Sequence, residues 1–224
     1  MLQRLLSLFM LLLALGENTV NSYVDEMNLG GYLFLVNRDF AISSTYEPRD
    51  LVMPDVKKTS NSVKMRKDAA EALEKLFAAA KTEENYTLVA VSGYRSYRTQ
   101  SNIFARKVNN VGTRAAMLLV APPGTSEHQL GLAMDIGCQG EMGLESSFGR
   151  TPEGKWVAEN CHRFGFIIRY KEEWTDITGY AYESWHLRYV GVEHATRIHE
   201  LDIPLEYYIE EVRNVQFALL EEGA

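Results

Sequence analysis

A one-sided apolar stripe in residues 62–81 constrains the fold of this chain more than any other segment. Its apolar residues recur at helical spacing and are Val63, Ala70, Leu73, Leu76, Phe77 and Ala80. With Ser62 as a candidate N-cap, this pattern predicts a helix over 62–81. A helix with one apolar face must bury that face, so we expect it to lie on a sheet.

Short apolar segments elsewhere in the chain can supply the strands of that sheet. The candidate strands are residues 32–37, 88–91, 166–170 and the second half of 182–190. Further helices are expected over 96–109 and 152–164, from about residue 191, and from about residue 204. The sequence has no internal repeat and no linker rich in Pro, Gly or Ser, so one domain is the simplest organisation.

The composition excludes several classes of protein. With 46% hydrophobic and 24% charged residues among 224, the chain can bury a core, which rules out a disordered protein, a collagen and a disulfide mini-scaffold. Its 23 Lys+Arg against 30 Asp+Glu give a net charge of −7. A protein that mainly grips phosphate backbones needs clustered cationic surface, so nucleic-acid binding is disfavoured.

The first sixteen residues carry no acid, one base (Arg4) and an apolar run from Leu5 to Leu15. As a helix the run would rise only about 16 Å, whereas a spanning helix must cross roughly 30 Å of hydrocarbon. Residues 1–16 are therefore predicted to be a secretory signal cleaved after Gly16, which places the protein outside the cytoplasm. An uncleaved membrane anchor and a buried N-terminal core helix remain the alternatives.

Two histidines and two carboxylates form a candidate catalytic centre. His128, Asp135 and His186 offer the N and O ligands that a catalytic zinc takes from a protein, with one position left for water. Glu183, three residues before His186, could take the proton from that water. Spacing along a strand and turn does not place His128 and Asp135 on one face, and a structural role remains the simpler interpretation of His128 alone.

The residues around these ligands favour the zinc site. Three blocks occur in order: 92–97 (Ser-Gly-Tyr-Arg-Ser-Tyr) with Gln100, then 123–135 from Pro-Gly-Thr-Ser-Glu-His to Asp, then 183–186 (Glu-Ser-Trp-His). Together they resemble the VanY-type D-alanyl-D-alanine carboxypeptidases, zinc peptidases of bacterial cell walls that include the LD-carboxypeptidases. The resemblance extends over about residues 33–210. One departure is Ser184, where many relatives have Pro; this position is not a ligand, so we expect the loop geometry to persist.

The resemblance implies a mechanism as well as a metal. His128, Asp135 and His186 would hold Zn²⁺, whose bound water would be the nucleophile, with Glu183 as general base and acid. Arg95 would stabilise the scissile carbonyl oxygen as it gains charge. The implied reaction is hydrolysis of the C-terminal D-alanine of peptidoglycan stem peptides, from either a DD- or an LD-substrate.

Gln100 and Ser126 match family positions that hold the terminal carboxylate of the substrate. An amide and a hydroxyl provide donors to a buried carboxylate without adding charge beside the metal. Two alternatives are a peptidoglycan endopeptidase of the same zinc superfamily and a catalytically inactive wall-binding relative. A free-carboxylate site argues against the first, and Glu183 argues against the second, because an inactive protein has no need of the base.

The resemblance also implies the organisation of the molecule: a single α+β domain with a small, mainly antiparallel sheet carrying the zinc site and helices packed around it. The expected division is a signal at 1–16, an extended N-terminal arm at 17–60, a catalytic domain at 61–215 and a tail at 216–224. We expect a bacterial, extracytoplasmic monomer whose partners are peptidoglycan stem peptides. In an exported protein, Cys138 and Cys161 could form a disulfide.

Overall fold

A four-stranded antiparallel sheet forms the centre of the computed structural model, which describes residues 31–222. The strands are β3 (Leu88–Ser92), β4 (Ala133–Cys138), β5 (Phe166–Tyr170) and β6 (Glu183–Tyr189), in the spatial order β3-β4-β6-β5. A second antiparallel pair consists of β1 (Leu51–Val52) and β2 (Met65–Arg66). The predicted α+β domain with a small antiparallel sheet is confirmed.

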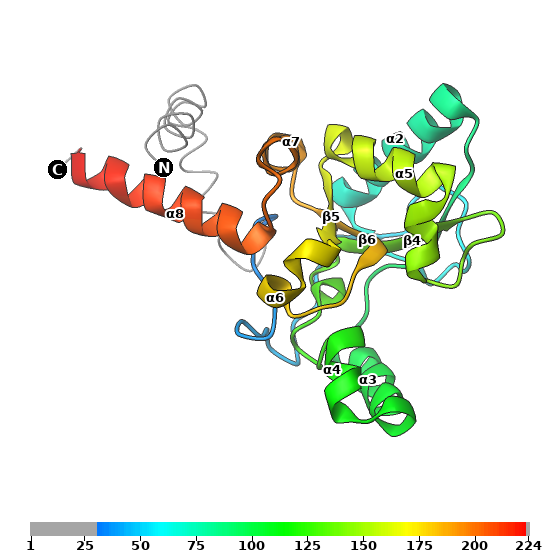
Figure 1. Cartoon of the computed structure of the whole chain (residues 1–224), viewed down its shortest axis with the longest axis horizontal. Helices are drawn as coiled ribbons and strands as arrows, with labels where there is room; N and C mark the ends of the chain where they lie inside the picture. Colours follow the sequence, from blue (N-terminus) through cyan, green and yellow to red (C-terminus); the bar gives the residue numbers. More distant parts are fainter. Residues whose placement is uncertain (1–30, 223–224) are drawn as a thin grey trace.

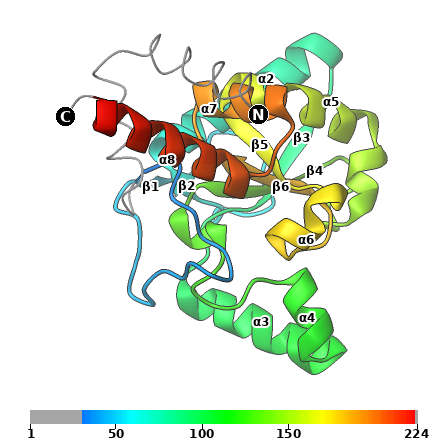
Figure 2. The same cartoon turned by 60° about the vertical axis from the view of Figure 1, so that its left-hand side comes forward.

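Helices surround this sheet. The α-helices are α2 (Lys67–Glu84), α3 (Tyr97–Val111), α4 (Thr113–Leu119), α5 (Pro152–Asn160), α6 (Thr175–Thr178), α7 (Val192–Leu201) and α8 (Leu205–Glu222). Short 3-10 helices are η1 (Glu127–Leu130), η2 (Ser146–Arg150), η3 (Cys161–Phe164) and η4 (Glu172–Trp174). Helices α2 and α5 lie on one side of the sheet, and the α3–α4 hairpin lies on the other (Figures 1 and 2).

The predicted helix at 62–81 begins later than the pattern indicated. Residues 65–66 pair with β1, which keeps the backbone extended until Arg66, so α2 starts at Lys67 and Ser62 does not cap it. The Ser62 hydroxyl forms a hydrogen bond with the Ser60 hydroxyl at 2.9 Å instead. The buried stripe of α2 nevertheless packs on the sheet as expected, because its residues share one core with strand residues of β3, β4 and β6.

Alternation along the strands gives the sheet two different faces. Met134, Ile136 and Leu187 enter the core with α2. Asp135 and His186, one residue out of step, point to the opposite face, where they are directly paired across β4 and β6. The candidate ligands therefore lie on the face turned away from the main apolar core.

The segment predicted as a strand at 32–37 is not a strand. Its backbone carbonyls at Tyr32 and Phe34 accept hydrogen bonds from the Arg188 guanidinium at 2.7 and 2.8 Å. Leu33 is buried in a second apolar cluster that includes Ile167 and residues of α7 and α8. Packing and pairing with Arg188 thus replace the sheet hydrogen bonds that the apolar run suggested.

The other predicted elements are present with shifted ends. The strands at 88–91 and 166–170 correspond to β3 and β5, and the strand predicted in the second half of 182–190 lies within β6, which begins earlier, at Glu183. The helix at 96–109 corresponds to α3. The helix at 152–164 is α5 followed by η3, and α7 and α8 begin close to the expected positions. Helix α8 continues to Glu222, across the boundary expected near 215, and the domain division stays a prediction.

The two cysteines are free, buried thiols, so the disulfide between them is not formed. Their thiols have different neighbours: Cys138 lies near Thr151 and Glu153, whereas Cys161 bonds the backbone of Ile168. Burial raises the pKa of the Cys161 thiol to about 12, so this thiol stays protonated near neutral pH.

The predicted signal at 1–16 lies outside the described residues. Within residues 31–222, none of the helices is long and apolar enough to cross a bilayer. The predicted monomeric state and the export of the protein stay predictions.

Candidate metal centre and cleft

A tight turn places His128 ahead of the strand that carries Asp135. His128 lies in η1, which ends at Gly131 with φ of 71°, in the left-handed region that glycine adopts without strain. A Cβ at Gly131 would also lie 2.9 Å from the Leu51 side chain. The chain then enters β4 with Asp135 pointing back towards His128.

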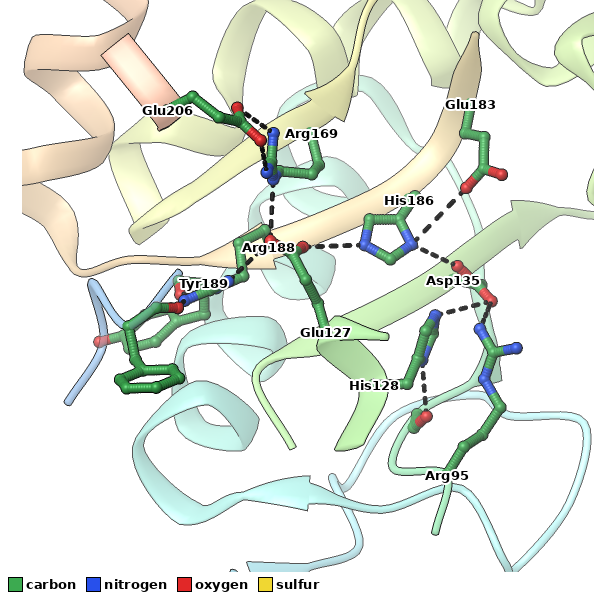
Figure 3. A network of polar contacts seen from close by, with 12 residues as sticks. Arg95, Glu127, His128, Asp135, Arg169, Glu183, His186, Arg188, Tyr189 and Glu206 are labelled. Atoms are coloured by element: carbon green, nitrogen blue, oxygen red, sulfur yellow. Dashed lines mark hydrogen bonds and ion pairs between the residues drawn. The ribbon is translucent and has the colours of Figure 1, made fainter. Parts of the chain in front are cut away.

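The predicted ligands converge in a buried cluster. His128 Nε2 lies 3.3 Å from Asp135 Oδ2, and His186 Nδ1 lies 3.1 Å from Asp135 Oδ1. One ligand atom from each of the three lies within 4.8 Å of the others. Figure 3 shows the two imidazoles and the carboxylate pointing at a common region.

Hydrogen bonds select the ring nitrogen that each histidine presents to the cluster. His128 Nδ1 donates to the Gly93 carbonyl at 2.7 Å, which leaves the Nε2 lone pair facing Asp135. Among the described residues, His128 Nε2 has no hydrogen-bond partner although it is buried. Gly93 itself is required by close packing, since a Cβ there would lie 2.1 Å from the Lys64 carbonyl oxygen.

These residues fit a catalytic zinc. Two imidazole nitrogens and one carboxylate oxygen are a ligand set that such a zinc takes from a protein. The buried His128 Nε2, which has no hydrogen-bond partner among the described residues, can serve as one of these ligand atoms. Glu183 stands beside this set, with Oε2 3.8 Å from His186 Nδ1. The cluster thus combines a metal-binding ligand set with an adjacent carboxylate.

The pKa values of the cluster follow from burial and close charges. Burial raises the pKa of Glu183 to about 7, with Asp135 adding to the shift. Burial and the Arg95 charge lower the pKa of His128 to about 4. Burial opposes charge on His186, but Asp135 and Glu127 raise its pKa to about 9. The positive charges of His186 and Arg95 both lie beside Asp135 and offset its negative charge.

An open cleft leads to the cluster. Its lining residues are Arg95, Gln100, Leu119, Val120, Ala121, Ser126, Glu127, His128, Tyr170, Tyr180, Glu183 and His186. The structure therefore brings every site residue predicted from the sequence into one place: all but Asp135 line the cleft, and Asp135 contacts the lining residues Arg95, His128 and His186.

The three polar residues predicted to contact the substrate have different surroundings in the cleft. Arg95 reaches Asp135 Oδ2 at 3.3 Å with one guanidinium nitrogen. Gln100 Nε2 donates to the Ala121 carbonyl at 2.7 Å, and its buried Oε1 has no hydrogen-bond partner among the described residues. Ser126 is buried at the N-cap position of η1, two residues before His128.

Sequence reasoning missed a second layer of residues. Glu127 lies between His186 and two buried arginines, Arg169 and Arg188, while the Tyr170 ring packs 4.9 Å from the His186 ring. A signal was present, because each arginine interrupts a strand whose neighbouring residues are apolar. A buried arginine requires a carboxylate partner, although a sequence does not identify which one.

The sequence is similar to that of a known protein family. Residues 62–192 match the family model VanY, described as D-alanyl-D-alanine carboxypeptidase. The Bacillus subtilis (strain 168) protein YodJ is 49% identical over 188 residues, which cover 82% of this chain and 68% of YodJ.

Solved structures share the fold. The LdcB LD-carboxypeptidase superposes with a TM-score of 0.77 at 49% identity, covering 82% of this chain and 88% of that one. A variant of the vancomycin resistance D,D-pentapeptidase VanY, solved in complex with Zn(II), has a TM-score of 0.66 at 37% identity, covering 80% of this chain and 98% of that one.

Proposed function

Because this chain belongs to the VanY family of zinc D-alanyl-D-alanine carboxypeptidases, we propose that it removes the C-terminal D-alanine from peptidoglycan stem peptides. The observation that carries the proposal is the buried cluster of His128, Asp135 and His186 with Glu183 at the edge of an open cleft. An inactive wall-binding protein would have no need of the Glu183 carboxylate beside the ligands.

Each residue of the cluster has a distinct task in this proposal. His128 Nε2, His186 Nδ1 and an Asp135 oxygen would hold Zn²⁺, which when bound supplies a Lewis acid that activates water and polarises a carbonyl. The Glu183 carboxylate, 3.8 Å from His186 Nδ1, would take a proton from the attacking water and return it to the leaving amine.

Arg95 supplies positive charge where the carbonyl oxygen becomes an oxyanion. Its guanidinium lines the cleft and reaches Asp135 at 3.3 Å, so it is held next to the ligand cluster with donors to spare. Fixed donors around a developing negative charge lower the barrier because they need little reorganisation during the reaction.

Gln100 and Ser126 would bind the terminal carboxylate of the substrate. Both side chains are buried in the lining of the cleft, and both can donate hydrogen bonds without carrying charge. A site that binds a free carboxylate measures the end of a peptide, which supports an exopeptidase over an endopeptidase, since an internal bond has no such group.

We further propose a preference for stems in which the terminal D-alanine follows an L-centre. The chain is 49% identical to the LdcB LD-carboxypeptidase and 37% identical to the VanY D,D-pentapeptidase. Because the substrate belongs to the cell wall, the proposal includes export directed by the N-terminal segment 1–16. The mass of the protein recovered from a bacterial culture would show whether this segment has been removed.

The deciding experiment is digestion of two defined stem peptides. The purified protein is incubated with a tetrapeptide that ends in an L-centre followed by D-alanine and with a pentapeptide that ends in D-Ala-D-Ala, and the products are weighed. We expect loss of one alanine, faster from the tetrapeptide. Faster cleavage of the pentapeptide would overturn the LD preference alone, whereas internal cleavage or no cleavage would overturn the carboxypeptidase assignment.

A further inference from the structure

His186 is held from both sides of its ring by carboxylates, and one of these carboxylates lies outside the ligand cluster. Nδ1 faces Asp135 Oδ1 at 3.1 Å, whereas Nε2 faces Glu127 Oε2 at 3.3 Å (Figure 3). Glu127 is fully buried and is not one of the three residues that could share a metal ion.

We infer that Glu127 is a positioning residue of the metal centre, and that it receives support from chain segments outside the family match. By accepting a hydrogen bond from His186 Nε2–H, Glu127 leaves Nδ1 as the nitrogen that presents its lone pair to the metal. This inference rests on the proposed function, because it assigns a task within the proposed zinc site.

The two oxygens of Glu127 have separate partners. Oε1 accepts from Arg169 Nε at 2.8 Å and from Arg188 Nη1 at 2.7 Å, and Oε2 is left for His186. Both arginines are fully buried and positively charged, so they keep Glu127 as an acceptor. A carboxylate that can only accept forces the facing imidazole nitrogen to donate.

One arginine connects Glu127 to the C-terminal helix. Arg169 makes a two-pronged pair with Glu206 in the first turn of α8, at 2.5 Å from Nη2 to Oε1 and at 2.9 Å from Nη1 to Oε2. Such forked pairs restrict a guanidinium in orientation as well as in position. Glu206 lies beyond residue 192, where the family match ends.

The other arginine connects Glu127 to the segment ahead of the family match. Arg188 Nη2 donates to the Tyr32 and Phe34 carbonyls at 2.7 and 2.8 Å. Both ends of the described chain therefore support the same carboxylate. Helix α8 also packs through Leu205 and other apolar residues, so the loss of Glu206 alone leaves its docking contacts in place.

The test measures zinc binding by three variants, Glu127→Gln, Glu206→Gln and Glu210→Gln, and compares each with the unsubstituted protein. Glu210 is exposed on the same helix and serves as the matched control. Zinc affinity is measured on the folded proteins by competition with a chromophoric chelator, and the ligand environment is read from the visible spectrum of the Co²⁺-substituted proteins.

We expect Glu127→Gln to weaken zinc binding about 10- to 100-fold and to shift the Co²⁺ spectrum. The reason is that the substitution replaces the negatively charged acceptor of the His186 hydrogen bond with a neutral amide. Glu206→Gln should produce a smaller loss in the same direction, and Glu210→Gln should produce none. A merely structural role would lower the melting temperature of Glu127→Gln and leave affinity and spectrum unchanged, which would overturn the inference.

A second comparison covers the case in which Glu127→Gln does not fold. Zinc affinities of Glu206→Gln and Glu210→Gln then decide, and equal values overturn the inference. Failure of the unmodified chain to bind zinc would instead refute the proposed function, so the two failures are distinguishable.

Discussion

The two faces of the central sheet are buried to a similar degree and are stabilised in different ways. On the α2 side, Met134 and Leu187 pack against other apolar side chains. On the opposite side, Asp135, His186 and Arg188 are buried as well, but each faces a charged or polar partner. Burial alone therefore does not distinguish a core from a functional site; the partners do.

This difference predicts different responses to substitution. An apolar face loses stability gradually as methylene groups are removed, because the remaining contacts persist. A polar face fails abruptly, because removing one partner leaves a buried charge or a free metal ligand. The following predictions test this contrast, from the largest expected effect on turnover to the smallest.

Removal of the metal should reduce peptide hydrolysis to background, because His128, Asp135 and His186 alone provide no activated water. Added zinc should restore the activity, and the circular dichroism spectrum should show that the apolar face keeps the fold intact. Full turnover after exhaustive chelation would refute a zinc mechanism.

Glu183→Gln should lower kcat by about 10²–10⁴-fold while zinc binding persists, because the amide cannot accept the proton of the attacking water. Glu173→Gln, at an exposed position in η4, is the control and should retain normal kcat. Wild-type turnover in Glu183→Gln would remove this residue from the mechanism.

Arg95→Ala should reduce kcat by about 10²–10³-fold, because a donor to the developing oxyanion is lost. Zinc content, measured by atomic emission, should remain close to one ion per chain. Arg98→Ala, at an exposed position nearby, controls for the loss of a positive charge. A chain that loses its zinc together with Arg95 would contradict the proposed role.

Leu73→Ala on α2 should have the smallest effect on turnover and a large effect on stability. Leu73 is fully buried in the apolar core, so truncation should cost about 2–5 kcal/mol in urea unfolding. The kcat/KM of the folded protein should not change. Met53→Ala, at a half-exposed position, should leave both quantities within experimental error. A selective loss of kcat/KM would mean that the two faces are coupled.

Periodicity predicted most helices and strands, and it failed where a tertiary partner overrode the local pattern. Residues 32–37 have the composition of a strand, yet the Tyr32 and Phe34 carbonyls of that segment accept hydrogen bonds from Arg188 rather than from a neighbouring strand. Ser62 has the chemistry of a cap, yet pairing of β2 with β1 delays the helix until Lys67. In both cases the competing contact comes from residues distant in sequence.

The sequence by itself determined the family and predicted the ligand types and a general base, because His128, Asp135, Glu183 and His186 stand in blocks of specific order. Only the tertiary structure decided how His186 is oriented. That orientation depends on Glu127, whose partners Arg169 and Arg188 lie on neighbouring strands β5 and β6. The register of a sheet and the docking of α8 create these contacts, and no local spacing encodes them.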